Sequence, residues 1–513
     1  MPHDVNGQEG QTLLEAMRAV FPAADAPCGG EGRCGRCRVL VREDAAPQLL
    51  SVMTNEEKRL LGVERAAAGW RLSCRTRFSR SGRVLVDQVE GEFYFPPVDD
   101  AKGTSSNDST RIGSDYCAAV DIGTTTITCA LAEVESGRVV ARTAAANRQR
   151  SYGPDVISRI ENAVGNPEYL REMHGLVRGQ VGEMLDGLCG QAGGIRIQRT
   201  HICGNPTMLH LWEGASLEGL ARMPFQPAFL ESRESELQAG GGTYSCRLLP
   251  GISAFVGADI TAGILACGLQ NASERPELLV DIGTNGEIVL AAEGRLFATA
   301  TAAGPAFEGA AISCGLPAID GAIDGVTWMD GRFNFTTLGK KPPAGICGSG
   351  LLDLLACLRR AGILDENGGL DAAPDAQGER AFLLPSDPPL RLTQSDVRQL
   401  QLAKGAIAAG IRVLCRRAGV ALADIGRLHL AGAFGSNLSA EAALEIGLVP
   451  NELSGRIHAA GNTALAGTLM TAVDPAALEI CARAASKVRV LDLSREAGFQ
   501  DAFMEAMRFT NNY

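Results

Sequence analysis

The fold of most of this chain is indicated by the stretch Ala118-Ala-Val-Asp121-Ile-Gly123-Thr124-Thr125-Thr126-Ile-Thr-Cys-Ala130. An apolar run ends in an aspartate, glycine and threonine form a tight turn, and a second apolar run follows. The stretch Leu278-Leu-Val-Asp281-Ile-Gly283-Thr284-Asn285-Gly286-Glu287-Ile-Val-Leu290 repeats the pattern 160 residues later. One copy could be an ordinary hairpin turn, but two copies at this spacing predict a duplicated fold.

Each turn has the chemistry of a phosphate-binding site. Glycine N–H groups and threonine hydroxyls can bind phosphate oxygens, and the aspartate can hold a metal ion or orient water. We expect Asp121 and Asp281 to position Mg²⁺ or the attacking water, with Glu287 and Asp259 as further candidates. Asp259 could instead cap the helix expected over 260–267. The phosphate contacts are expected from Gly123, Thr124, Thr125, Gly283, Thr284, Asn285 and Gly286.

Later segments repeat as well. Long helices are expected over 168–188 and 394–418, and each precedes a strand that enters a glycine turn, at 195–208 and 425–437. Each half then shows a strand and a helix-opening glycine, at 254–259 and 458–463. Two facing strand–strand–helix–strand–helix lobes resemble the actin, sugar kinase and Hsp70 superfamily. That resemblance implies α/β duplicated RNase H-like lobes with a nucleotide in the cleft between them.

Two glycine-rich segments of the second lobe are further candidates for the nucleotide site. Gly432 and Gly435 fit the loop that the superfamily uses for adenosine, because glycine lets the base and ribose lie on the backbone. Gly348, Ser349 and Gly350 open a helix with clustered glycines, which is an anion-binding geometry. Close helix packing is the alternative explanation for this second segment.

The N-terminal segment contains Cys28-Gly-Gly-Glu-Gly-Arg-Cys34-Gly-Arg-Cys37, and Cys74 follows later. Four thiolates suit an iron–sulfur cluster, and glycine lets backbone N–H groups approach the sulfurs. A structural zinc site is less favoured because it usually has two Cys-x2-Cys pairs. A disulfide framework would need an oxidising compartment, and no signal peptide is visible.

The rest of this segment predicts a small domain over 1–92. A helix is expected over 11–20, a strand over 38–42, a short helix over 55–61 and a strand over 83–87. This order resembles a 2Fe–2S ferredoxin of the adrenodoxin-like branch, which implies an α+β ferredoxin-like (β-grasp) fold. Only about ten residues precede the first helix, so we expect the usual first strand to be missing or very short. Residues 93–115 read as a flexible linker. The two lobes would span 116–275 and 276–513.

Composition excludes some functions. The net charge of −11 disfavours a nucleic-acid partner, and no run of 18 apolar residues predicts a membrane span. Fifteen cysteines without a secretory signal predict a reducing cytoplasm. Eleven of them lie outside the expected cluster site, and we expect these to be buried core residues. Cys314 and Cys347, in glycine-rich loops, are the expected exceptions.

The whole chain resembles the reductive activators of corrinoid proteins. The matching stretches are Cys28–Cys37, Asp121–Thr126, Asn147–Arg159, Gly204–Met208, Val256–Asp259, Asp281–Glu287, Gly345–Gly350, Gln401–Ile407 and Leu430–Gly435. The resemblance implies an enzyme that uses ATP and Mg²⁺ to pass one electron from a 2Fe–2S cluster to a corrinoid methyl-carrier protein, reducing inactive Co(II) to Co(I). It also implies an upstream electron donor and a homodimer.

Two other classes of function remain as alternatives. One is an ATP-binding redox sensor without turnover, which two intact phosphate loops disfavour. The other is a small-molecule kinase with a fused electron-transfer domain, which would give the cluster no task. The related dehydratase activators lack a ferredoxin domain, so the N-terminal cysteines distinguish this chain from them.

Overall fold

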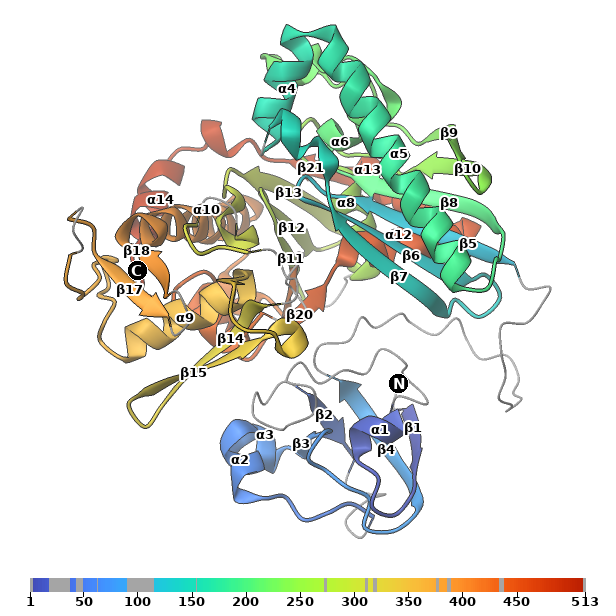
Figure 1. The fold of residues 1–513 in the computed structure, drawn as a ribbon. Helices are drawn as coiled ribbons and strands as arrows, with labels where there is room; N and C mark the ends of the chain where they lie inside the picture. The colour runs from blue at the N-terminus through green and yellow to red at the C-terminus, as the bar shows by residue number, and fades with distance from the viewer. Residues whose placement is uncertain are drawn as a thin grey trace.

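The computed structural model describes residues 3–17, 37–42, 49–61, 63–89, 115–153, 155–271, 275–309, 312–316, 321–374, 378–384, 389–432 and 438–510. A small N-terminal domain lies beside two larger lobes, each built on a six-stranded sheet (Figure 1). Within these residues, no helix is both long and apolar enough to cross a membrane. The expected linker over 93–115 lies almost wholly outside them.

The N-terminal domain has a four-stranded sheet in the order β1-β4-β2-β3. Its elements are β1 (His3–Gly7), α1 (Leu13–Met17), β2 (Arg38–Val41), α2 (Asn55–Leu61), α3 (Val63–Ala67), β3 (Trp70–Leu72) and β4 (Gly82–Val89). The predicted strands and short helix are confirmed. The buried core includes Leu13, Met17, Leu72 and Phe78.

The first strand is present, contrary to the expectation that it would be missing or very short. β1 has five residues and pairs antiparallel with β4 along its whole length, from His3 opposite Val86 to Gly7 opposite Gly82. Val5 is the one buried apolar side chain of β1, so the strand lacks the alternation of apolar residues by which a strand is predicted. Gly7 packs so closely on Phe78 that an added Cβ would lie 2.2 Å from the ring. Backbone pairing, which the sequence pattern does not reveal, forms this strand.

The first lobe has the sheet order β7-β6-β5-β8-β10-β9. The strands are β5 (Tyr116–Ile122), β6 (Thr126–Glu133), β7 (Val139–Ala146), β8 (Ile197–Gly204), β9 (Arg233–Ala239) and β10 (Gly242–Leu248). The helices are η2 (Arg148–Tyr152), α4 (Val156–Gly165), α5 (Pro167–Gln191), α6 (Pro206–Glu213), α7 (Glu218–Ala221) and α8 (Ala258–Ala266). The duplicated hairpin β5–β6 is antiparallel, and β8 joins β5 in parallel.

The prediction of a strand just before Gly257 is wrong. β10 takes the position beside β8, pairing with it in parallel from Cys246 to Leu248. Residues 252–256 instead bond among themselves, with the N–H groups of Ile252 and Ser253 both donating to the Val256 carbonyl. Gly257 then opens α8 as expected.

The second lobe repeats the first lobe's strand pattern, in the sheet order β20-β19-β11-β12-β13-β21. Its strands are β11 (Glu277–Ile282), β12 (Gly286–Ala292), β13 (Arg295–Thr301), β19 (Arg427–Ala431), β20 (Ile457–Gly461) and β21 (Val488–Val490). The β11–β12 pair is antiparallel, while β19 joins β11 in parallel and β20 joins β19 in parallel. The predicted duplication is therefore confirmed.

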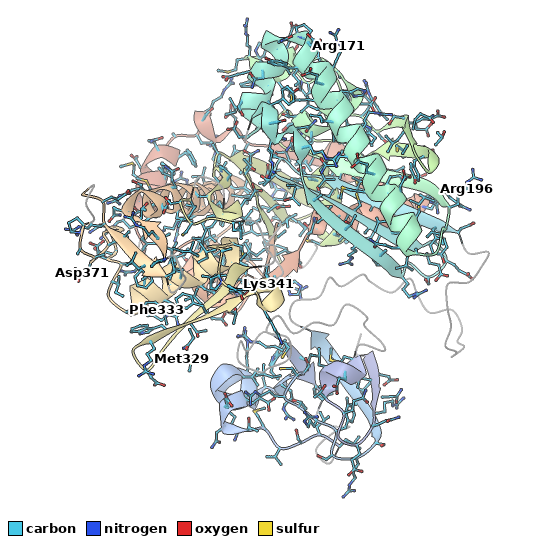
Figure 2. The ribbon with its side chains drawn as sticks, viewed as in Figure 1. Arg171, Arg196, Met329, Phe333, Lys341 and Asp371 are labelled. Atoms are coloured by element: carbon cyan, nitrogen blue, oxygen red, sulfur yellow. The ribbon has the colours of Figure 1, made fainter. Side chains whose placement is uncertain are left out.

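The other strands, and the other helices longer than three residues, belong to the second half of the chain. They are η4 (Pro305–Glu308), β14 (Ala322–Met329), β15 (Arg332–Thr337), β16 (Gly345–Ile346), α9 (Gly348–Arg360), β17 (Ala381–Leu384), β18 (Leu390–Thr393), α10 (Gln394–Ala418), α11 (Ala440–Glu445), α12 (Thr463–Val473), α13 (Pro475–Lys487) and α14 (Phe499–Ala506). The β14–β15 hairpin projects from the lobe and carries Met329 and Phe333 (Figure 2). Phe333 packs on Trp328 and Phe382, with ring centroids 4.5 and 5.0 Å away.

Two helices cross between the lobes. Ile260 and Ile264 of α8 pack with Leu279 of the second sheet. In return, Leu465 of α12 packs with Ala119 of the first sheet. The two helices touch so closely that a Cβ on Gly467 would lie 1.9 Å from the Ala262 carbonyl oxygen. Each lobe is thus completed by a helix from the other half of the chain.

Candidate functional site

The two predicted phosphate turns join the first two strands of each lobe. In the first, the Gly123 N–H donates to the Thr126 carbonyl, and a Cβ on Gly123 would lie 2.5 Å from that oxygen. Only glycine fits this turn without a shift of the backbone. In the second, the Gly283 N–H donates to the Asn285 carbonyl. Local backbone bonding therefore holds both turns in the geometry that the sequence predicts.

Three side chains from other elements brace the first turn. The Asn147 amide donates to the Gly123 carbonyl at 2.9 Å, and the Arg159 guanidinium donates to the Thr124 carbonyl at 2.7 Å. The Asn205 amide donates to the Thr124 hydroxyl at 2.9 Å. Arg159 is fully buried, and this burial lowers its pKa to about 10. Sequence reasoning assigned these three residues no role, because each lies far along the chain from the turn it supports.

One carboxylate connects the two turns. Oε2 of Glu308 accepts a hydrogen bond of 2.5 Å from the Thr125 hydroxyl and one of 2.8 Å from the Thr284 hydroxyl. The turns of the two lobes therefore converge on a single oxygen atom. Sequence reasoning missed Glu308, although the glycines on either side of its short helix, Gly304 and Gly309, were a weak signal.

The predicted aspartates gather around this point. Burial raises the pKa of Asp121 to about 6, and hydrogen bonds from Asn462 and Cys203 oppose the shift. Burial, together with the charges of Asp259, Asp121 and Glu308, raises the pKa of Asp281 to about 8. Since each carboxylate disfavours ionisation of the others, the cluster has a low affinity for further negative charge unless a cation is present.

The other predicted acids belong to the same cluster. Burial raises the pKa of Asp259 to about 7, and the Asp121 charge adds to the shift. Burial also raises the pKa of Glu287 and of Glu308. Asp259 lies in the first turn of α8 rather than at its cap, which is Gly257, and its Oδ1 accepts the Ile260 N–H at 2.8 Å.

The described residues bring no three Asp, Glu, His or Cys side chains together as a metal site. Magnesium usually binds proteins through one or two carboxylates together with water and substrate phosphates. The donor chemistry of Asp121 and Asp281 fits that mode, in which the nucleotide completes the coordination. A site made of protein side chains alone does not fit.

The first lobe's aspartate is tied to the second half of the chain. The Asn462 amide, at the N-cap of α12, donates to Asp121 Oδ2 at 2.7 Å. On its other oxygen, Asp121 accepts a weaker bond of 3.7 Å from the Cys203 thiol. The position of α12 between the lobes therefore sets the orientation of this carboxylate.

The two glycine-rich segments proposed for the nucleotide site, 348–350 and 432–435, differ in what their described residues contact. The Ser349 hydroxyl is buried and donates to the Asp324 carbonyl at 2.9 Å, while a Cβ on Gly350 would lie 2.3 Å from the Ile323 carbonyl oxygen. Close packing of α9 thus explains Gly350, while an anion site at Gly348 and Ser349 stays a prediction. Gly432 has φ +123°, and its Cβ would lie 2.2 Å from the Ile282 carbonyl oxygen beside the second turn. Gly435 lies outside the described residues.

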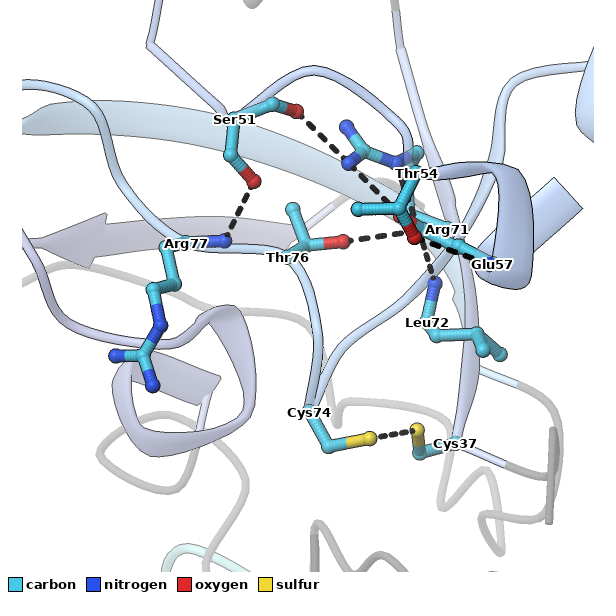
Figure 3. A network of polar contacts seen from close by, with 9 residues as sticks. All are labelled: Cys37, Ser51, Thr54, Glu57, Arg71, Leu72, Cys74, Thr76 and Arg77. Carbon is cyan, nitrogen blue, oxygen red and sulfur yellow. Dashed lines mark hydrogen bonds and ion pairs between the residues drawn. The ribbon is translucent and has the colours of Figure 1, made fainter. Parts of the chain in front are cut away.

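In the N-terminal domain, the structure brings Cys37 and Cys74 together. Both are buried, and their Sγ atoms lie 3.0 Å apart (Figure 3). This distance exceeds the roughly 2.05 Å of a disulfide bond, so no disulfide joins the two cysteines, and two of the expected cluster ligands lie side by side. The Ser73 N–H donates to the Cys37 carbonyl and holds the two segments together. Cys28 and Cys34 lie outside the described residues.

A buried acid shapes the segment that carries Cys74. Glu57 is 1% exposed, and its Oε1 accepts from the Leu72 N–H at 2.8 Å and from Arg71 Nε at 2.9 Å (Figure 3). Arg71 also donates to the Ser51 carbonyl. This network fixes residues 71–76, and with them the position of the Cys74 thiol.

The cysteines outside the expected cluster site are mostly buried, as predicted, with Cys189 and Cys267 partly exposed. Cys314 and Cys347, the expected exceptions, are both buried, so that expectation is wrong. Burial raises the pKa of Cys314 to about 12 and also raises that of Cys347. Both thiols are therefore core residues rather than reactive groups.

The N-terminal domain contacts the second lobe through α11. Arg65 forms an ion pair of 2.6 Å with Glu441, and Arg38, next to Cys37, lies 3.9 Å from the same carboxylate. The Glu441 side chain is 55% exposed. Exposed ion pairs contribute about 0–1 kcal/mol, so this contact is weak.

Two converging hairpin turns on duplicated lobes define a member of the actin, sugar kinase and Hsp70 class, here joined to a ferredoxin-type domain with paired thiols. Comparison with known families agrees. Residues 2–79 match a 2Fe-2S iron-sulfur cluster binding domain, residues 116–272 the RACo middle region, and residues 275–513 the C-terminal domain of RACo, an ASKHA domain. The chain belongs to the family of reductive activators of corrinoid proteins.

Individual relatives support this assignment. The corrinoid activation enzyme RamQ of Eubacterium limosum is 31% identical over 424 residues, covering 77% of this chain and 71% of that protein. A [Co(II) methylated amine-specific corrinoid protein] reductase of Methanosarcina barkeri is 26% identical over 306 residues, covering 53% of this chain and 55% of that one. The solved structure of a reductive activator for corrinoid, iron-sulfur protein superposes with a TM-score of 0.72 at 28% identity, covering 98% and 96% of the two chains.

Proposed function

We propose that this protein is an ATP-dependent reductive activator, which reduces the inactive Co(II) form of a corrinoid methyl-carrier protein to Co(I) by one electron. The observation that carries the proposal is the pairing of two sites in one chain. Thr125 and Thr284, from different lobes, meet at one oxygen of Glu308, and the N-terminal domain places the sulfur atoms of Cys37 and Cys74 3.0 Å apart. A nucleotide site and an electron-carrier site together suit a reaction that couples ATP to electron transfer.

The roles of the residues follow from their chemistry. We assign Cys28, Cys34, Cys37 and Cys74 to a 2Fe–2S cluster, which when bound supplies a one-electron carrier. The first turn, braced by Asn147, Arg159 and Asn205, would present its N–H and hydroxyl groups to phosphate. Asp121 and Asp281 would hold Mg²⁺ or orient water, and the raised pKa values of their carboxyl groups would fall beside a cation.

The reduction of Co(II) to Co(I) needs a nucleotide for a physical reason. Each ~100 mV by which the donor falls short of the Co(II)/Co(I) couple costs about 2.3 kcal/mol for one electron, from ~59 mV per tenfold change in equilibrium constant. A protein can supply such an amount only by binding two states with different affinity. Because α8 and α12 link the lobes, closure of the turns around a nucleotide would alter the surface offered to the corrinoid protein.

The direct test is an anaerobic mixture of the purified protein, Mg-ATP, a chemical reductant and a Co(II) corrinoid protein. Appearance of the Co(I) absorption band only when ATP is present supports the proposal. Equal rates without nucleotide would rule it out. Cys74→Ala should abolish the reaction, whereas Cys415→Ala, at a buried cysteine of α10, serves as the matched control and should retain it.

We propose a cytoplasmic location, because no disulfide joins the cysteines of the described residues, as expected in a reducing compartment. An upstream reductase or ferredoxin must supply the electrons. The homodimer implied by the family would be tested by light scattering on the purified protein.

A further inference from the structure

Glu308 is held at the junction of the two lobes by its backbone. It ends η4, which lies between Gly304 with φ +73° and Gly309 with φ +79°. A Cβ on Gly309 would lie 2.8 Å from backbone atoms of Leu316. Just before Glu308, Ala306 and Phe307 are buried in the core of the second lobe. The carboxylate is therefore anchored from one side and reaches across to the other lobe.

The hydroxyl protons of Thr125 and Thr284, one from each turn, are both donated to Glu308. A threonine hydroxyl has one proton to donate. Thr125 gives its proton to Glu308 Oε2, and Thr284 gives its proton to the same oxygen. The other oxygen, Oε1, lies beside the second turn, where a Cβ on Gly283 would approach it to 3.4 Å. A carboxylate thus occupies the place where the turn chemistry predicts phosphate oxygens.

We propose that Glu308 is an internal competitor of the nucleotide: in the nucleotide-free protein its carboxylate takes the phosphate position and ties the two lobes together, and a nucleotide phosphate displaces it. The inference rests on the proposed nucleotide site and adds a residue that sets the affinity of that site. Displacement is required because neither hydroxyl can donate to Glu308 and to a phosphate at once. Two anions of this kind also repel each other when they share one set of donors.

The inference predicts tighter nucleotide binding when the charge is removed. Glu308→Gln keeps the length and one acceptor oxygen, but it loses the charge that strengthens both hydrogen bonds. A charge-assisted hydrogen bond is stronger than a neutral one, so the variant binds the two hydroxyls less tightly. We expect the Kd for ATP and for ADP to fall on the order of tenfold in this variant, and at least as far in Glu308→Ala.

The experiment compares four full-length proteins by isothermal titration calorimetry with Mg-ATP and Mg-ADP: wild type, Glu308→Gln, Glu308→Ala and Glu293→Gln. Glu293 lies in the exposed β12–β13 turn, where it pairs with Arg295, and it provides the matched control. Tighter binding by both Glu308 variants and unchanged binding by the control support the proposal. Equal or weaker binding by the Glu308 variants overturns it and leaves the nucleotide site intact. No binding by any of the four proteins overturns the nucleotide site as well.

A second measurement does not depend on affinity. Hydrogen exchange of the nucleotide-free protein reports the local opening of residues 123–126 and 283–286. If Glu308 ties the lobes, Glu308→Gln should raise exchange in both turns and leave the control unchanged. Unchanged exchange in both turns would overturn the proposal even in variants that fold well by circular dichroism.

Discussion

Asp281 offers a sharp test of the electrostatics at the junction of the lobes. Burial and the neighbouring charges of Asp259, Asp121 and Glu308 raise its pKa from 3.8 to about 8. Between these two values the folded protein keeps a proton that the unfolded chain releases. Asp281 therefore contributes stability that is fully present below pH 3.8 and is lost as the pH rises to about 8. Asp281→Asn keeps the shape of the side chain and removes this titration.

The size of the change in unfolding free energy follows from the pH range over which Asp281 titrates. From pH 5 to the folded pKa of about 8 is about three units. At about 1.36 kcal/mol per unit this gives up to about 4 kcal/mol. The Asp281 side chain is partly exposed and shares its shift with neighbouring acids, so we expect about half of this, roughly 2 kcal/mol. For lobes of this size that corresponds to several degrees in Tm.

The assay is thermal unfolding of the nucleotide-free protein at pH 5, 7 and 9, followed by circular dichroism. Asp281→Asn should gain stability relative to wild type as the pH rises. Asp330→Asn, at an exposed turn of the β14–β15 hairpin, is the matched control and should show no such trend. A constant difference between Asp281→Asn and wild type across this range would refute the reasoning, because it would mean that Asp281 is ionised throughout.

Three further variants test other parts of the structure. Cys74→Ser should abolish the visible absorption of an iron–sulfur cluster, with Cys415→Ser as the control; a spectrum retained in both would exclude Cys74 as a ligand. Arg159→Met removes the hydrogen bonds to the Gly153 and Thr124 carbonyls and a weaker one to the Met208 sulfur. It should cost about 2–4 kcal/mol in unfolding free energy and weaken ATP binding, whereas unchanged ATP affinity in the folded variant would argue against bracing of the turn. Lys404→Met removes a fully buried ammonium whose pKa burial lowers to about 7. Between pH 7 and 10 the unfolded chain holds a proton on Lys404 that the folded chain does not. The unfolding free energy of the wild type relative to this variant should therefore rise by up to about 4 kcal/mol over that range. A difference that does not change with pH would contradict the lowered pKa.

Much of the fold could be predicted because its signals are local. The stretches ending in Asp121 and Asp281 are apolar strands closed by a glycine–threonine turn, and both proved to be antiparallel hairpins at matching positions in their sheets. The predicted helix over 394–418 coincides with α10, because a capping box at Thr393 begins it and Gly419 ends it. In each case the residues that cause the structure lie within one element of each other.

Other predictions failed where the cause lies far along the chain. β1 depends on pairing with β4, almost eighty residues later, and the strand expected near Ala254 is absent because β10 takes its position beside β8. The glycines that open α9 suggested either an anion site or close packing; Gly350 packs against the Ile323 carbonyl, and the anion site stays a prediction. The sequence does not show which atoms of the folded chain pack against a given glycine.

The sequence by itself determined the two hairpin turns, the cysteine spacing and the duplication, since these depend on the chemistry of neighbouring residues. Only the tertiary structure decided that Thr125 and Thr284 converge on Glu308 and that Arg159 supports the first turn. It also decided that α8 and α12 cross between the lobes. The physical reason is that each of these contacts joins residues far apart in sequence, so no local pattern of residues predicts the contact. Such a contact forms only when both sheets have formed and packed together.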